Sequence, residues 1–234
     1  MWIIVGLGNP GREYAQHRHN VGFEALDRLA ARVGADPFRE KFSGELSRAT
    51  IAGEPSVLLK PMTYMNESGR SVQPALTFFK ARPAELIVLH DELDLAFGDV
   101  RLKIGGGHAG HNGLRSIMTQ LGTGDFARVR IGVGRPPAGF RGEIADYVLS
   151  GFDAGERARL PDGLNLAIES VLQVAAHGFE AAMKVRNTRI KPTKPASRAP
   201  AAAPSLEEQQ GRASRGKGPP ADAEGEGPAP NRKA

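Results

Sequence analysis

Hydrophobic positions along the chain alternate between short continuous runs and helical spacing, which predicts strands interleaved with helices. Residues 2–5 and 86–89 are continuous apolar runs that end at glycine or polar positions, as buried strands do. Residues 46–51 and 56–59 flank a Gly-Glu-Pro turn and predict a hairpin. Apolar residues at helical spacing predict helices over 20–34 with Asn20 as N-cap, from after Pro61 to about 80, over 114–121, and over about 153–177.

Two further strands carry basic residues at every second position. Arg101 and Lys103 alternate with apolar residues over 100–104. Arg128 and Arg130 do the same over 128–133. Period two puts the basic residues of each strand on one face. Strands alternating with helices and hairpin-like neighbours predict an α/β fold, a single globular domain with a mixed twisted sheet flanked by helices.

Composition separates the last part of the chain from the rest. Of residues 191–234, 23 are alanine, proline or glycine, and Leu206 is the one large apolar residue. Ordering a residue costs roughly 1 to 2 kcal/mol, which so little burial cannot offset. We therefore expect a folded domain over residues 1–190 and a disordered, basic, Ala/Pro/Gly-rich tail over residues 191–234.

Charge and cysteine content exclude several classes of protein without identifying a partner. The net charge is +5, of which +3 falls in residues 191–234, so the body is not a polycation. The absence of cysteine excludes disulfides, thiolate nucleophiles and cysteine metal sites. No apolar run approaches the roughly 20 residues of a membrane span, and Met1 leads straight into Trp2-Ile3-Ile4-Val5 without the basic region and apolar core of a signal peptide, so we expect none. We expect a cytoplasmic protein that does not contact a membrane.

Gly6, Gly8 and Gly11 spell the dinucleotide fingerprint G-x-G-x-x-G after a strand, but the context argues against a nucleotide. Such a site needs a helix whose N-terminus meets the pyrophosphate, whereas Pro10 and polar residues 12–20 extend the loop. No acidic residue ends a second strand about 20 positions on. A glycine-rich turn explains the glycines and leaves the neighbouring Asn9 and His19 unexplained.

Histidines gather in predicted turns and at strand ends, where functional groups concentrate; these are His17, His19, His90, His108 and His111. As metal ligands they lack the helical H-E-x-x-H frame of zinc hydrolases. A metal-free alternative is a histidine general base whose tautomer a carboxylate holds, and His19 with Asp91 is the candidate pair. Asp91 follows a predicted strand, at the edge where open α/β sheets place their sites. Solvated loop histidines and turn-forming acids are the alternatives for each residue alone.

Three asparagines, Asn9, Asn66 and Asn112, stand in constrained turns. A side-chain amide both donates and accepts hydrogen bonds, so it can bind a peptide backbone or an oxyanion. Helix capping is the alternative, and spacing favours it for Asn66 and Asn112, which directly precede helical positions. No nucleophile elbow, P-loop or cysteine supports a covalent or nucleotide-driven step.

Five motifs together resemble the bacterial peptidyl-tRNA hydrolase family, in order across residues 3 to about 185. They are Gly6-Leu7-Gly8-Asn9-Pro10-Gly11 with Tyr14, Arg18-His19-Asn20-Val21-Gly22, Met65-Asn66-x-Ser68-Gly69, His90-Asp91-Glu92-Leu93-Asp94, and Gly105-Gly106-Gly107-His108-x-Gly110-His111-Asn112-Gly113. The resemblance implies a hydrolase that cleaves the ester between a peptide, or an N-blocked amino acid, and the terminal ribose of tRNA. It would release tRNA for reuse in translation, with residues 1–190 as its catalytic domain and no metal or other cofactor.

The resemblance also implies a role for each candidate residue on the peptide side. His19 resembles the general base, and Asp91 resembles the residue that holds it in its basic form. Asn9 resembles the residue that separates blocked peptidyl substrates from free aminoacyl-tRNA. Asn66 and Asn112 resemble amides that bind the peptide and position water.

On the tRNA side, the resemblance places Tyr14 and Tyr64 beside the substrate's terminal nucleotide. Tyr64 stands where an aromatic residue such as phenylalanine is common in the family. Lys103 and Arg130 resemble the family's tRNA phosphate contacts, which agrees with the two basic strand faces. Residues 141–150 follow Pro136-Pro137 and are a candidate mobile lid over the site.

The expected partners are peptidyl-tRNA and, as a further candidate, stalled ribosomal subunits, with the protein itself a monomer. A non-catalytic tRNA- or rRNA-binding protein on the same fold is the main alternative, although such a protein needs neither His19 nor Asp91. A zinc hydrolase is the third candidate. The positive charge of residues 191–234 is a candidate source of salt-sensitive RNA affinity.

Overall fold

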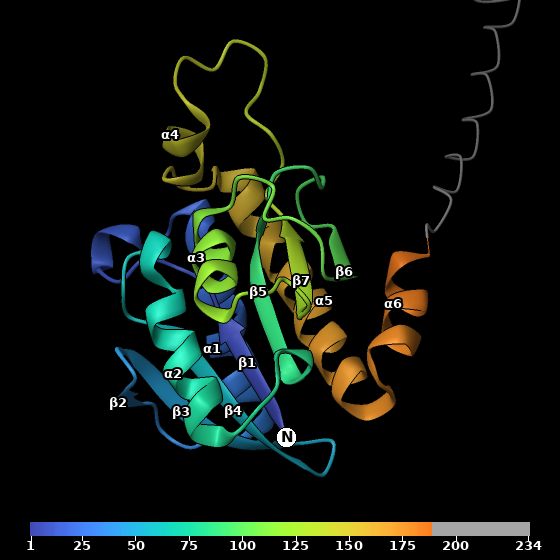
Figure 1. Ribbon diagram of the computed structural model, residues 1–234. Helices are drawn as coiled ribbons and strands as arrows, with labels where there is room; N and C mark the ends of the chain where they lie inside the picture. Colours follow the sequence, from blue (N-terminus) through green and yellow to red (C-terminus); the bar gives the residue numbers. More distant parts are fainter. Residues whose placement is uncertain (189–234) are drawn as a thin grey trace, which may run out of the picture. The chain divides into compact units, whose positions relative to one another are not determined.

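A seven-stranded mixed sheet forms the centre of the protein in the computed structural model, which describes residues 1–188 (Figure 1). The strands lie in the order β2-β3-β4-β1-β5-β7-β6. Four of them, β4, β1, β5 and β7, are parallel, and β3, β2 and β6 add antiparallel edges. Their bounds are β1 Trp2–Gly6, β2 Arg39–Lys41, β3 Gly44–Ile51, β4 Glu54–Pro61, β5 Leu86–Glu92, β6 Val100–Ile104 and β7 Ala127–Gly132. The predicted α/β fold with a mixed sheet is confirmed. The tail predicted over 191–234 lies outside the described residues.

Helices cover both faces of this sheet. One apolar cluster joins α1 (Val21–Val33) and α5 (Ala154–His177) to one face, and a second joins α2 (Gly69–Phe79) and α3 (Asn112–Leu121) to the other. Successive residues of β1 alternate between the clusters, with Ile3 and Val5 in one and Ile4 in the other, as period two requires. The predicted hairpin is β3–β4, and the predicted long helix is α5, capped by Asp153.

Short elements occupy the connections. Four 3-10 turns, η1 (Arg12–Tyr14), η2 (Arg18–Asn20), η3 (Met65–Glu67) and η4 (Pro83–Glu85), precede α1, α2 or β5, and α4 (Ile144–Val148) follows the long segment after β7. None of the helices in residues 1–188 is both long and apolar enough to cross a bilayer.

The last helix of the described residues, α6 (Phe179–Asn187), was not predicted, because its apolar face is short: Phe179, Ala182 and Met183 pack against the core, and only Ala182 is buried. Polar contacts with edge strand β6 add to this packing. The Leu102 N–H donates to Asn187 Oδ1 at 2.9 Å, and Asn187 Nδ2 donates to the Leu102 carbonyl at 2.7 Å. Arg101 Nη1 donates to the Arg186 carbonyl at 3.1 Å.

Gly22 lets α1 approach the sheet closely enough to set the position of the residues before it. A Cβ at Gly22 would lie 2.5 Å from the Leu89 carbonyl oxygen and 2.6 Å from the Leu7 nitrogen, which leaves no space for a side chain. Because α1 crosses β1 and β5 at this distance, the η2 turn that precedes it is held beside the carboxyl end of β5.

Candidate active site

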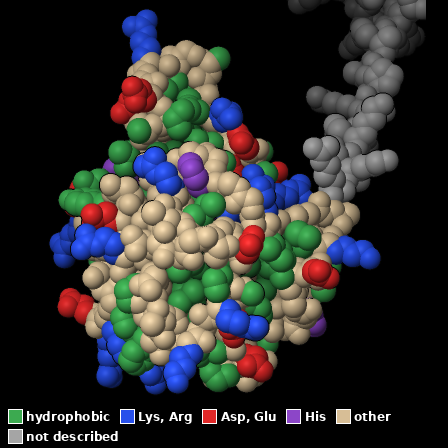
Figure 2. Space-filling view, in the orientation of Figure 1, with side chains coloured by type: hydrophobic (Ala, Val, Ile, Leu, Met, Phe, Trp, Pro, Cys, Tyr) green, Lys and Arg blue, Asp and Glu red, His purple; other side chains and the backbone are tan. Residues whose placement is uncertain are grey.

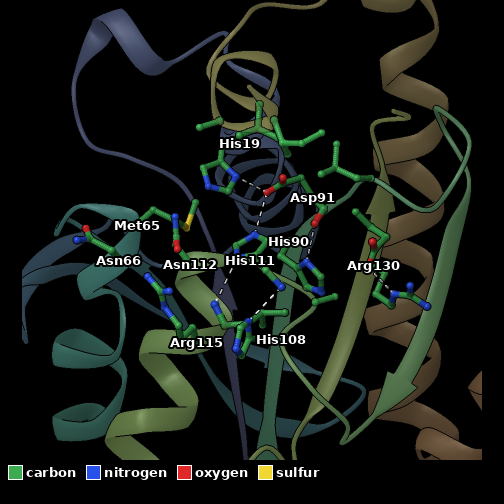
Figure 3. Close-up of a pocket in the computed structure, with 18 of the residues that line it drawn as sticks. His19, Met65, Asn66, His90, Asp91, His108, His111, Asn112, Arg115 and Arg130 are labelled. Atoms are coloured by element: carbon green, nitrogen blue, oxygen red, sulfur yellow. Dashed lines mark hydrogen bonds and ion pairs between the residues drawn. The ribbon is translucent and has the colours of Figure 1, made fainter. Parts of the chain in front are cut away.

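A cleft of about 800 Å³ opens at the carboxyl ends of the parallel strands (Figure 3). Segments that follow β1, β4 and β5 reach it, together with η2, the glycine-rich loop before α3 and part of the segment around α4. Every site residue expected from the sequence lines this cleft: Asn9, Tyr14, His19, Tyr64, Asn66, Asp91, Lys103, Asn112 and Arg130. The topology therefore gathers five separate motifs at one edge of the sheet, the edge expected for Asp91.

Asp91 is the centre of a buried hydrogen-bond cluster. Its Oδ1 lies 2.8 Å from His19 Nδ1 and 3.0 Å from His111 Nε2 (Figure 3). The centroids of the two imidazole rings are 4.9 Å apart. The structure thus brings together the pair expected from the sequence and adds His111 as a second donor to the same oxygen.

Burial and the neighbouring charges have opposite effects on the pKa values of His19 and Asp91: burial favours the neutral form of each, and the neighbouring charges favour the ionised form. Burial disfavours the imidazolium, but the charge of Asp91 and its hydrogen bond outweigh this and raise the pKa of His19 above its ordinary value of 6.5. Burial also opposes ionisation of Asp91, yet the neighbouring His19 and His111 hold the pKa of that carboxyl well below its usual range. With Nδ1–H directed to the carboxylate, Nε2 of His19 is the nitrogen free to accept a proton.

His111 is held in one neutral tautomer. Its Nδ1 accepts from the backbone N–H groups of Gly113 and Leu114 at 3.1 and 3.3 Å and so caps α3. The proton therefore lies on Nε2, where it is donated to Asp91. Sequence reasoning counted His111 among the loop histidines and missed this role. Its place directly before helical spacing was the available signal.

The same tautomer argues against a metal at this cluster, although one ligand atom from each of His19, Asp91 and His111 lies within 4.8 Å of the others. A metal on Nε2 of His111 needs the lone pair there, and so needs the proton moved to Nδ1. A proton on Nδ1 would point at the N–H groups of Gly113 and Leu114, which now donate to that nitrogen, and both capping bonds would be lost. The donor set of the cluster is built for hydrogen bonds.

The remaining turn histidines contribute differently. His90 is buried and directs Nδ1 to the Asp91 carbonyl oxygen at 2.7 Å. Burial, with His111 nearby, lowers the pKa of His90 to about 3, so its ring stays neutral. His108 lines the cleft and accepts a hydrogen bond from the Gly110 N–H, whereas His17 packs edge-on against Tyr14.

Asn9 is held from two sides. Asn20 Oδ1 accepts from the Asn9 N–H at 3.0 Å, and Asn20 Nδ2 donates to the Asn9 carbonyl at 2.9 Å. Asn9 Oδ1 accepts from the Met65 N–H at 2.8 Å, which leaves Asn9 Nδ2 as the donor for the cleft. Asn20 is the N-cap residue of α1 as predicted, but its side chain forms no capping bond with the helix because its amide is committed to Asn9.

Asn66 and Asn112 are not helix caps, so the capping interpretation favoured by their spacing is wrong for both. His111 caps α3 in place of Asn112, and Asn66 lies inside η3. Both amides are exposed in the cleft, and neither forms a hydrogen bond within residues 1–188. They are free to bind a substrate. In Figure 3 they lie on the opposite side of the cleft from Arg130.

The basic strand residues share one face, because Arg101 pairs with Arg130 and Lys103 with Arg128 across β6 and β7. They do not share one role. Arg128 is buried and donates to the carbonyls of Gly106 and Gly107 at 2.7 Å each, which fixes the glycine-rich loop. Arg101 is bound to α6.

Lys103 and Arg130 remain at the cleft. Lys103 is exposed, and Arg130 Nε donates to Glu92 Oε2 at 2.8 Å, which orients the guanidinium. Figure 2 shows Lys and Arg side chains at this end of the molecule, below α4, as well as along its lower edge. The exposed ring of Tyr64 and that of Tyr14 lie at the same cleft.

Comparison with known proteins agrees with this geometry. The sequence model of the peptidyl-tRNA hydrolase family matches residues 3–194. A peptidyl-tRNA hydrolase of Sorangium cellulosum is 76% identical over 194 residues, covering 83% of this chain and 87% of that protein. One of Mycobacterium tuberculosis is 51% identical over 181 residues, covering 77% and 94%. The crystal structure of peptidyl-tRNA hydrolase from Acinetobacter baumannii superposes with a TM-score of 0.74 at 40% identity, over 80% of this chain and 95% of that one. The chain belongs to the peptidyl-tRNA hydrolase family.

Proposed function

We propose that this member of the family releases tRNA from peptidyl-tRNA by metal-free general-base catalysis, with residues 1–190 as the catalytic domain and His19 as the base. The observation that carries the proposal is the 2.8 Å contact between His19 Nδ1 and Asp91 Oδ1. It fixes the imidazole tautomer that leaves Nε2 basic, and it stabilises the imidazolium that forms when water loses its proton.

The reaction follows from the donors and acceptors of the cleft. His19 Nε2 takes a proton from water while the oxygen of that water attacks the ester carbonyl, which becomes a tetrahedral oxyanion. The amides of Asn66 and Asn112 are placed to bind the oxyanion and the peptide. When the intermediate collapses, the C–O bond to the ribose breaks and the imidazolium returns its proton to the leaving oxygen. An ester needs less activation than an amide, so one oriented base and a few donors suffice.

Asn9 supplies the selection of blocked substrates. Its Nδ2 faces the cleft as a donor because Oδ1 is bound by the Met65 N–H. An acylated nitrogen belongs to a peptide group with a carbonyl that can accept this bond, whereas a free α-ammonium group would meet another donor.

The tRNA is bound at the basic side of the cleft. Lys103 and Arg130 contact backbone phosphates, and Tyr14 and Tyr64 offer faces to the terminal nucleotide. We also propose that the protein acts in the cytoplasm as a monomer and takes substrate from stalled ribosomal subunits. In support of a monomer, the exposed large apolar side chains of residues 1–188 that lie outside the cleft are spread over separate segments. Sedimentation of the full chain tests this part.

The test of the mechanism is release of N-acetyl-amino acid from N-acetyl-aminoacyl-tRNA, measured beside unblocked aminoacyl-tRNA, with and without EDTA. We expect hydrolysis of the blocked substrate that resists EDTA and collapses in His19→Ala. The exposed His177 at the end of α5 gives the matched control, since His177→Ala removes an imidazole far from the cleft in sequence and fold. Full activity in His19→Ala would overturn the base assignment, and loss of activity in EDTA would restore the zinc alternative.

A further inference from the structure

Arg18, the residue before His19, carries a buried charge that the mechanism does not use. Its side chain is 7% exposed, and Nη2 lies 2.7 Å from Glu156 Oε2. The guanidinium carbon lies 4.4 Å from the centroid of the Tyr147 ring and 4.8 Å from that of Phe152. One guanidinium thus contacts a carboxylate and two aromatic rings that stand about 130 residues later in the chain.

Those contacts join the two ends of the segment that connects β7 to α5 and contains α4, residues 133–153, called the α4 segment below. Tyr147 lies in α4, and its hydroxyl donates to the Val133 carbonyl at 3.2 Å, directly after β7. Phe152 lies just before α5, and Glu156 lies in the first turn of α5, where it also accepts from the Asp153 N–H and so completes the helix cap. The segment between these two ends extends above α4 in Figure 1.

Backbone contacts bring the same segment to the turn that carries His19. The Arg18 N–H donates to the Ser150 carbonyl at 3.0 Å, and His17 forms a bridge with Gly151. The side chain and the main chain of residues 17–18 therefore hold one end of the α4 segment, one residue before His19.

The segment supplies an apolar wall to the cleft. Ile144, Val148 and Leu149 line it, and Ile144 and Leu149 remain 46% and 39% exposed. The wall can contact the substrate at a fixed distance from His19 only if the end of the segment is held in place against η2.

A buried arginine is a costly way to fill space. Replacing a buried ion pair by apolar side chains is often neutral or stabilising, so the Arg18–Glu156 pair is poorly explained by stability alone. Two of the Arg18 nitrogens, Nε and Nη1, are buried without a hydrogen-bond partner within residues 1–188. An oriented guanidinium does what an apolar side chain cannot, because it fixes the angle between two rings and a carboxylate.

We propose that Arg18 is a positioning residue that attaches the end of the α4 segment to the η2 turn. This attachment keeps the apolar wall at a fixed position relative to His19. The inference rests on the proposed function, in which His19 is the base. Arg18 does not touch the substrate. It acts through Tyr147, Phe152 and Glu156.

Three variants separate orientation from charge and from simple packing. Arg18→Met keeps an apolar stem and loses the charge and the planar group. Arg18→Lys keeps the charge and loses the planar group. Glu156→Gln keeps Arg18 and can still accept from the Asp153 N–H, but it removes the opposite charge. Arg186→Met is the matched control, because Arg186 is also a largely buried guanidinium in an ion pair, 3.6 Å from Glu169 of α5, and it does not contact Tyr147, Phe152 or Glu156.

The readouts are hydrogen exchange, steady-state kinetics on N-acetyl-aminoacyl-tRNA, and the pH profile of kcat/KM. In Arg18→Met we expect amides 138–150 to exchange about tenfold faster while those of β1 and β5 keep their rates. We expect KM to rise about tenfold with a small change in kcat, since the wall contributes to binding and not to proton transfer. The acid limb of the pH profile should not move. Glu156→Gln and Arg18→Lys should give smaller shifts in the same direction, and Arg186→Met none.

Two results would overturn the proposal. One is unchanged exchange of residues 138–150 in both Arg18→Met and Glu156→Gln. The other is a fall in kcat with a displaced pH profile, which would mean that Arg18 acts on His19 directly. If Arg18→Met does not fold, Arg18→Lys and Glu156→Gln carry the same test. Exchange in the α4 segment is independent of chemistry, so full activity in His19→Ala would refute the base while leaving this test intact.

Discussion

Replacing Asp91 by asparagine removes the negative charge beside His19 and keeps the hydrogen-bond acceptor, so it measures the contribution of the charge alone. Asparagine has almost the shape of aspartate, and its Oδ1 can still accept from both His19 Nδ1 and His111 Nε2 at the distances of 2.8 and 3.0 Å. The tautomer of His19 is therefore retained, whereas the imidazolium formed during proton transfer loses its counter-charge.

The size of the effect follows from the separation of the charges. Two unit charges about 4 Å apart interact by about 4 kcal/mol at an effective dielectric constant of about 20. Because the proton is only partly transferred in the transition state, about half to all of this energy reaches the barrier, which is about a 30- to 1,000-fold fall in kcat.

The pH profile of Asp91→Asn gives the sharper test. His19 is active as a base when neutral, so the activity of the wild type should rise with pH through a midpoint above 6.5, because the pKa of His19 is raised. Loss of Asp91 leaves burial as the main influence and lowers the pKa of His19, so the midpoint of the variant should move to lower pH. Single-turnover rates from pH 5 to 9 measure it, with Asp27→Asn, whose carboxylate pairs with Lys60 on another face, as control. An unmoved midpoint with a large loss of rate would refute the electrostatic role of Asp91.

Four further outcomes test other parts of the structure. Asn9→Asp keeps the acceptor for the Met65 N–H but replaces the donor in the cleft by a negative charge, so the preference for blocked over free aminoacyl-tRNA should fall about 100-fold in kcat/KM; an unchanged ratio would contradict the role of Asn9. Lys103→Met should reduce the slope of log Kd for tRNA against log salt by about one, and equal slopes would place Lys103 away from phosphate. The pKa of His90 is lowered to about 3 in the folded protein, so as pH falls below 6.5 this histidine is protonated in the unfolded chain and stays neutral in the folded one. The free energy of unfolding should then fall by up to about 1.4 kcal/mol per pH unit below 6.5, and denaturant titrations at pH 7 and 5 should show a smaller difference in His90→Phe. Gly22→Ala should lower the free energy of unfolding by about 2 to 4 kcal/mol, since its Cβ would lie 2.5 Å from the Leu89 oxygen; a melting temperature equal to that of wild type would show that α1 can retreat.

The elements that hydrophobic periodicity describes were predictable from the sequence. The buried strands β1 and β5, the hairpin β3–β4 and the helices α1, α3 and α5 follow local apolar patterns, and tertiary packing agrees with them. The approach of His19 to Asp91 was predictable as a hypothesis, because Asp91 stands at a strand end and His19 follows a glycine-rich turn. Helix α6 was not, since its apolar face is limited to Phe179, Ala182 and Met183, and polar contacts with β6 supply much of its attachment.

The parts of the site that sequence reasoning missed are side-chain pairs between distant segments. His111 is a cap whose other nitrogen meets a carboxylate 20 residues earlier, and Arg18 meets Glu156 across 138 residues. Each pair depends on where α1, α3 and α5 sit against the sheet to within an ångström. Close approaches such as that at Gly22 set those positions, and spacing along the chain does not record them.

The side-chain amide of Asn187 protects one edge of the sheet and so affects the tendency of the protein to self-associate. An open sheet presents unpaired N–H and C=O groups at its outer strands, where another chain can add by edge-to-edge pairing. At one edge, β2 is short and consists of Arg39, Glu40 and Lys41, which discourages such addition. At the other edge, Asn187 bonds to both the N–H and the carbonyl of Leu102 in the manner of a neighbouring strand. A chain cut before Asn187 would keep the whole cleft and expose β6, so we expect it to remain a competent enzyme that self-associates as its concentration rises.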